Sequence, residues 1–245
     1  MKKPNGYRAM CVLALAALFF PIAALAQQQR PPLAEQVAKE FGIDQFGQLD
    51  AIRWTFNLQL GEIKFARTWT WEPKTNRVTY EAKDKAGNPV KVTYSRTDMN
   101  SQTAQVKDEI DPNFVNDQYW LIFPFHVIWD SSPTVTDEGM AKLPVGQGTA
   151  QHLVVKYPAE AGGYTPGDTW ELFIGPDKRV KAFIYRRGGT KKPSLVIANW
   201  TAYKKAGPLL VATDHPGKAD GKAFRILFTD VAYKAGGSDA WMDAK

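Results

Sequence analysis

The side chains that could carry out chemistry in this 245-residue chain are few and widely spaced. The three histidines, His126, His152 and His215, have no second ligand at the spacing of a metal site. The single cysteine, Cys11, lies far from all of them. The sequence therefore predicts neither a metal site nor a cofactor.

Acid–base chemistry would have to come from carboxylates. Asp117, Asp130 and Glu171 lie near aromatic residues, as the acids of glycosidases often do. We prefer a simpler interpretation, in which Asp117 is a polar position on a helix surface and Asp130 is a turn acceptor. The chain also lacks the G-x-S-x-G pattern of a serine nucleophile. We expect no enzyme, and keep a carbohydrate-active or other hydrolase with paired carboxylates as the alternative.

The first 26 residues have the features of a secretory signal peptide. Lys2, Lys3 and Arg8 precede an apolar stretch that ends in the small-residue pattern of residues 24–26. Cys11 lies at the start of that stretch and not after the cleavage site, so we expect no lipid modification. The pattern predicts export to the periplasm and cleavage after residue 26.

Cleavage would leave 28 basic and 25 acidic residues, which are scattered along the chain. A net charge of +3 without a basic stripe argues against a nucleic-acid partner and permits transient contact with an anionic membrane surface. We expect a monomer.

Hydrophobic periodicity divides the remaining chain. Residues 27–50 contain a leader and a short amphipathic helix, in which Leu33 and Val37 share one face. From residue 51 apolar and polar residues alternate, as is typical of strands with one wet face. Asp111 and Pro112 form a helix-start signal, and we expect the helix to end at Phe123, before the next proline.

The strands resume at residue 153, so residues 51–245 form a β domain with a helical insertion near 111–123. We expect one structural domain that includes the N-terminal helix. The fold class is mainly β with α: a strongly curved antiparallel sheet of about ten strands, with helices on its concave face. A structural β module without a ligand is a further alternative.

Residues 116–130 are unusually rich in large aromatic side chains. They have two interpretations, a core helix with the strand that follows it, or a lid or floor for an apolar ligand.

The order of these elements, with the segments 52–56, 69–74 and 167–172, resembles the periplasmic lipoprotein carriers, the LolA-like and LolB-like family. The resemblance covers most of the chain after residue 26, although no single motif is specific. It implies an unclosed β-barrel whose concave side holds acyl chains under helices. The chain departs from the family in the loop of residues 164–168 and in its longer, more aromatic insertion.

The expected function is an exported carrier that binds acyl chains of a lipid or lipoprotein, for outer-membrane lipoprotein sorting. Each buried methylene contributes about 0.8 kcal/mol, so an apolar groove holds a chain without many hydrogen bonds. Arg67 lies on the same face of its strand as the aromatic residues. Its side chain would meet a headgroup, hold a lid in place, or extend along the margin of the sheet. The expected groove residues are Trp54, Phe56, Phe65, Arg67, Trp69, Trp71, Tyr80, Trp120, Phe123, Phe125 and Trp170.

Overall fold

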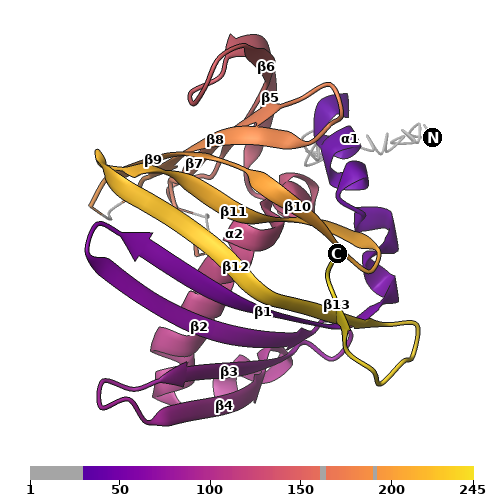
Figure 1. Cartoon of the computed structure of the whole chain (residues 1–245), viewed down its shortest axis with the longest axis vertical. Coiled ribbons are helices and arrows are strands. Elements are labelled where there is room, and N and C mark those ends of the chain that lie inside the picture. The colour runs from indigo at the N-terminus through magenta and orange to yellow at the C-terminus, as the bar shows by residue number, and fades with distance from the viewer. Residues whose placement is uncertain (1–29, 161–163, 190–191) are drawn as a thin grey trace, which may run out of the picture.

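The fold is one large antiparallel sheet that is not closed into a barrel (Figure 1). The computed structural model describes residues 30–160, 164–189 and 192–245, so the expected signal peptide lies outside the described residues. The thirteen strands are ordered β4-β3-β2-β1-β12-β11-β9-β8-β7-β6-β5, with β10 beside β11 and β13 beside β12. The expected curved sheet is confirmed, with more strands than the ten that alternation indicated.

The element bounds follow in chain order. The helices are α1 (Pro32–Glu40), the 3-10 helices η1 (Ile43–Gln48) and η2 (Arg96–Ser101), the π-helical turn η3 (Val106–Ile110) and α2 (Asp111–Trp129). The first strands are β1 (Leu49–Leu60), β2 (Ile63–Glu72), β3 (Arg77–Lys83), β4 (Pro89–Ser95), β5 (Thr134–Lys142) and β6 (Thr149–Lys156). The others are β7 (Thr169–Ile174), β8 (Val180–Arg187), β9 (Ser194–Asn199), β10 (Thr201–Ala206), β11 (Leu209–Ala219), β12 (Lys222–Ala235) and β13 (Met242–Asp243).

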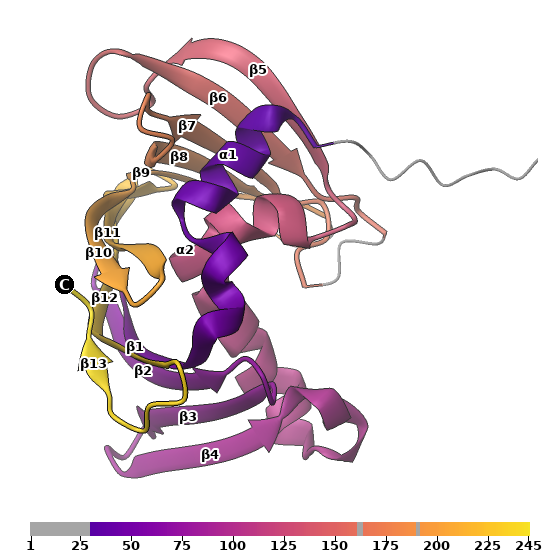
Figure 2. The ribbon, with the colours of Figure 1, turned by 90° about the vertical axis from the view of Figure 1, so that its right-hand side faces the viewer.

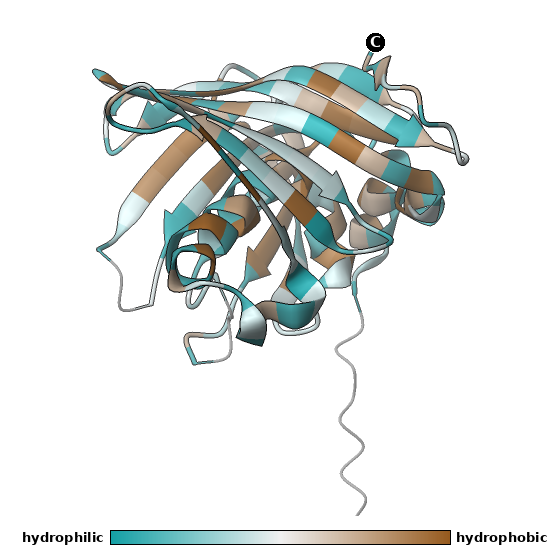
Figure 3. Ribbon diagram, turned by 90° about the horizontal axis from the view of Figure 1, so that it is seen from below, coloured by the Kyte–Doolittle hydropathy of each residue, from teal (hydrophilic) through white to brown (hydrophobic). Residues whose placement is uncertain are grey.

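The sheet curves around α1 and α2, which lie in its hollow (Figure 2). Leu33 and Val37 of α1 join the same buried cluster as the inward residues of the strands. Along β1 the residues Ile52, Trp54 and Phe56 are buried, while Arg53 and Thr55 between them are half-buried, as alternation predicted. Seen from below, apolar and polar residues alternate along the strands, which surround the helices in the hollow (Figure 3).

Helical backbone begins before α2, earlier than the sequence indicated. Helical geometry already holds through η3, where the amide of Asp111 bonds the carbonyl of Val106. Pro112 has no N–H, and its ring would clash with the carbonyl four residues before it, so a wider turn precedes it. Asp111 therefore does not cap the helix. Its fully buried carboxylate instead accepts hydrogen bonds from Tyr94 and Arg96.

The expected end of the helix at Phe123 is also wrong, because α2 continues through Pro124 to Trp129. The backbone leaves helical geometry at Ile122, which places a kink just before the proline. Pro124 cannot bond the carbonyl of Trp120, four residues earlier. His215 Nε2 on β11 donates to that carbonyl at 3.0 Å and replaces the missing bond.

Two further differences concern strands. Strand β5 was not expected, because most of its residues are exposed and give no clear alternation. The sequence pattern from Leu195 to Tyr203 predicts a single strand, but the structure has two strands there, β9 and β10, interrupted at the buried Trp200. Across the described part of the chain, no helix has the length and apolar character needed to cross a membrane.

Candidate functional site

A cleft of about 390 Å³ lies between the strands and α2, and we call it the Arg67 cleft. Strands β1, β2, β8, β9 and β12 and helix α2 form its walls. Cross-strand pairing brings its side chains together, since Phe56 lies opposite Arg67 and Leu58 lies opposite both Phe65 and Ile226. It is lined by Phe56, Leu58, Phe65, Arg67, Asn116, Trp120, Tyr185, Arg187, Ser194, Phe224 and Ile226.

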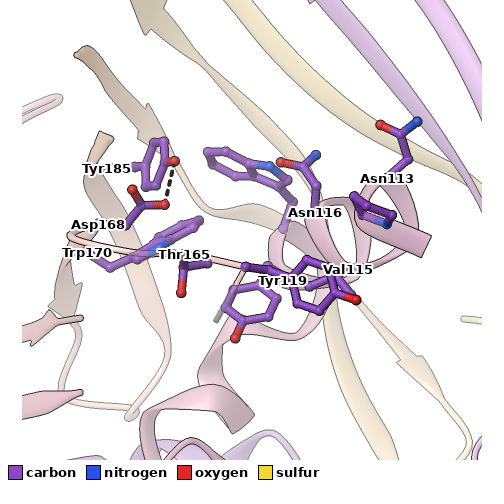
Figure 4. Close-up of a pocket in the computed structure, with 11 residues that line it drawn as sticks. Asn113, Val115, Asn116, Tyr119, Thr165, Asp168, Trp170 and Tyr185 are labelled. Carbon is purple, nitrogen blue, oxygen red and sulfur yellow. Dashed lines mark hydrogen bonds between the residues drawn. The ribbon is translucent and has the colours of Figure 1, made fainter. Parts of the chain in front are cut away.

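A second cleft, of about 250 Å³, adjoins the first, and we call it the Asp168 cleft. The two clefts share Asn116, Trp120 and Tyr185 as lining residues. The Tyr185 hydroxyl donates to the Asp168 carboxylate at 2.9 Å, beside the ring of Trp170 (Figure 4). Together the two clefts form one indentation beside the N-terminal half of α2.

Arg67 is held by a buried carboxylate on α2. Its Nε and Nη2 donate to the Asp117 carboxylate at 2.9 and 2.7 Å, and Trp69 Nε1 and Asn116 Nδ2 donate to the same group. The guanidinium also lies over the ring of Phe65, 4.6 Å from its centroid. Burial raises the pKa of Asp117 to about 6, and Arg67 opposes that rise. The expected position of Asp117 on the helix surface is wrong, because its side chain is fully buried.

Asp130 follows α2 and is more than a turn acceptor. Its carboxylate accepts from Tyr119 at 2.6 Å, from Tyr157 at 2.7 Å and from His126 Nδ1 at 3.0 Å. Burial acts to raise the pKa of Asp130, but the hydrogen bond from His126 and those from the tyrosines outweigh it, so the pKa is lowered. This network ties the end of α2 to Tyr157, which directly follows β6.

Glu171 belongs to a third network, with His152 at 3.1 Å and Arg186 at 2.9 Å. Within the described ranges, no hydrogen-bond network contains two of the carboxylates Asp117, Asp130 and Glu171. Those ranges also hold no group of three or more His, Cys, Asp or Glu side chains placed to bind a metal ion. Each of these three carboxylates therefore belongs to a separate hydrogen-bond network.

The expected groove residues do not all line one groove. Phe56, Phe65, Arg67 and Trp120 line the Arg67 cleft, and Trp170 lines the Asp168 cleft. The other members of the set line neither cleft. Trp54 and Trp71 border a narrow internal space, and Trp69 packs on Tyr80 and Phe114. Phe123 stacks on Trp170, and Phe125 packs on Phe46.

Sequence reasoning missed several lining residues, most of all Tyr185 and Arg187 on β8. Both side chains lie on the same face of β8, two positions apart. A tyrosine and an arginine on one face of an alternating strand were the signal that could have found them. The sequence pattern indicates that Phe224 and Ile226 lie on one face of a strand. Whether that face meets a cleft depends on how β12 pairs with β1, which the pattern does not give.

No family model and no curated protein matches this chain. Among solved structures, it is similar to a DUF1329 family protein from Desulfovibrio piger, at 10% identity over 85% of this chain and 94% of that chain, with a TM-score of 0.44. It is also similar to a LolA superfamily protein from Nitrosomonas europaea, at 7% identity over 81% of this chain and 92% of that chain, with a TM-score of 0.44.

Proposed function

We propose that this chain is an exported carrier that binds an acyl chain of a lipid or lipoprotein in the Arg67 cleft. The observation that supports the proposal is the cleft itself, whose volume of about 390 Å³ lies in the range of small-molecule sites. Its walls are mostly apolar, and Phe65 remains 39% exposed beside it. When a methylene chain covers an apolar ring that is in contact with water, the free energy of the system falls, which favours binding.

The architecture supports the same role. Helix α2 fills the centre of the hollow, where Phe114 contacts Trp54, Trp69 and Trp71. This packing leaves the Arg67 cleft at the periphery of the core, as an indentation with a rigid floor. A preformed cleft binds with little ordering cost, which suits a carrier that takes up and releases its cargo.

The test is binding of a fluorescent long-chain lipid probe to Phe65→Asn, with Ile63→Asn as the matched control. Both residues are exposed on the same face of β2, but only Phe65 lines the cleft. Loss of an apolar wall worth about 1.5–3 kcal/mol should weaken binding about tenfold or more in Phe65→Asn. Ile63→Asn should bind like the parent, and both variants should remain folded.

Native mass spectrometry after gentle extraction supplies the second measurement, because a carrier should copurify with lipid. If no lipid copurifies and no acyl probe between eight and eighteen carbons binds, the carrier proposal is wrong and the chain is a structural β module. Equal binding by the two variants would place the ligand outside the Arg67 cleft.

A further inference from the structure

The charged side chains that line the Arg67 cleft are all positive. Of its eleven lining residues, the two charged ones, Arg67 and Arg187, are both arginines. Among the other polar lining residues, Asn116 has a second side-chain N–H besides the one that it donates to Asp117, whereas the hydroxyls of Tyr185 and Ser194 donate to Asp168 and Asp220. We propose that the cargo of this cleft is a single-chain amphiphile whose polar end is an acid group, held by Arg67 and Arg187. This inference rests on the proposed function and adds the chemical class of the ligand.

Arg67 is positioned for this role before any ligand arrives. Its Nε and Nη2 are occupied by Asp117, and no hydrogen bond to its Nη1 is found within the described residues. The side chain is 13% exposed, so the remaining N–H groups border the cleft. A guanidinium fixed on one side by a carboxylate loses little conformational entropy when it binds a second anion on the other.

The balance of charge leaves room for one more anion. Asp117 neutralises Arg67, whereas Arg187 uses its Nε on the backbone carbonyl of Lys192. The carboxylate of Asp220 lies near Arg187, but it accepts from the Ser194 hydroxyl and from a backbone amide and is not a lining residue. The lining arginines and Asp117 together leave an excess of about one positive charge in the Arg67 cleft, while Asp168, which accepts from Tyr185, places a negative charge in the adjoining cleft. One acid group beside Arg187 would match the excess in the Arg67 cleft.

The apolar walls adjoin these cations directly. The Arg67 guanidinium lies over Phe65 and Phe56, 4.6 and 5.4 Å from the ring centroids. A ligand that places its acid group on the arginines would therefore place its chain against these rings. A volume of about 390 Å³ is near the lower end of the range of small-molecule sites. This suits one alkyl chain better than the several chains of a lipoprotein anchor.

The experiment compares ligands that share a sixteen-carbon chain and differ in the polar end. Isothermal titration of the full mature chain with palmitate, hexadecyl phosphate, hexadecanol and hexadecyltrimethylammonium, each below its micelle concentration, gives the preference. We expect either acid to bind at least tenfold more tightly than hexadecanol, and the cation to bind most weakly. The two acids together show whether a carboxylate or a phosphate is preferred.

Arg187→Gln tests the residue assignment, and Arg186→Gln is its matched control. Arg186 is the adjacent residue on β8, pairs with Glu171 and does not line the cleft. Arg187→Gln should reduce the preference for palmitate over hexadecanol at least fivefold, through a larger loss of affinity for palmitate than for hexadecanol. Arg186→Gln should retain the preference of the parent. The double variant Arg67→Gln/Asp117→Asn should lower palmitate affinity further without leaving a buried carboxylate unpaired.

Each result decides a different point. Equal affinity for palmitate and hexadecanol, or equal effects of Arg186→Gln and Arg187→Gln, would overturn the acid-group inference and leave the carrier proposal intact. Failure of every sixteen-carbon ligand to bind would overturn both. Inorganic phosphate that displaces the ligands at micromolar concentration would show a plain anion site and overturn the requirement for a chain.

Discussion

Two buried titratable groups, Asp117 and His215, should act on stability in opposite directions over the same range of pH. Burial raises the pKa of Asp117 from 3.8 to about 6 in the folded state, against the opposing effect of Arg67. Between about pH 4 and 6 the folded chain therefore binds more protons at this site than the unfolded chain. The free energy of unfolding contributed by Asp117 falls as pH rises through this range, by about 3 kcal/mol for a shift of about two pKa units.

His215 has the opposite sign. Burial lowers its pKa from 6.5 to about 4, so the unfolded chain binds more protons here than the folded chain between about pH 4 and 6.5. The contribution of His215 to the free energy of unfolding therefore rises with pH, again by about 3 kcal/mol. The two terms nearly cancel in the parent protein, and neither would be visible in its own pH profile.

Single variants should separate the two terms. Urea unfolding followed by tryptophan fluorescence, at intervals from pH 4 to 7, gives the free energy of unfolding for the parent, Asp117→Asn and His215→Gln. Relative to the parent, Asp117→Asn should lose about 3 kcal/mol as pH falls from 6 to 4, and His215→Gln should gain about 3 kcal/mol over nearly the same range. A constant offset from each lost contact does not alter these slopes. Profiles parallel to that of the parent for both variants would refute the reasoning.

Two further predictions concern a loop contact and the N-terminus. Gly188→Ala should lower the free energy of unfolding by about 1–3 kcal/mol in urea titrations, because an added Cβ would lie 2.0 Å from the backbone oxygen of Gly167. Gly47→Ala, whose added Cβ meets nothing within 4 Å, should change it little, and equal effects would contradict the packing argument. Intact mass of protein from the periplasm should show a chain that begins at Gln27, and a retained signal or an added lipid on Cys11 would disprove this expectation.

Much of the fold could be predicted because period-two alternation reports burial directly. The alternation of Trp54 and Phe56 with polar neighbours fixed both the position and the inward face of β1. The helix ends could not be predicted, because the effect of Pro124 depends on His215, a residue far away in the sequence. A local proline rule cannot include a hydrogen-bond donor that only the tertiary fold supplies.

The candidate site was less predictable than the fold. Parity places Phe65 and Trp69 on one face of the same strand, yet Phe65 borders a cleft and Trp69 is covered by Phe114 of α2. Where the helix crosses the sheet decides which rings are covered, and that position does not appear in the strand pattern. Arg187 was missed for the same reason, since β8 reaches the cleft only through the curvature of the whole sheet.

The pairing of β1 with β12 also has a consequence for how the chain folds. Leu60 lies opposite Phe224 and Leu49 opposite Ala235, so the centre of the sheet joins residues near the two ends of the described chain. Contacts so distant in sequence require a large loss of chain entropy before they stabilise anything, and proteins rich in them fold in milliseconds to seconds. We therefore expect a chain cut short before β12 to leave β1 with an unpaired edge, and folding to begin only once the last long strand is available.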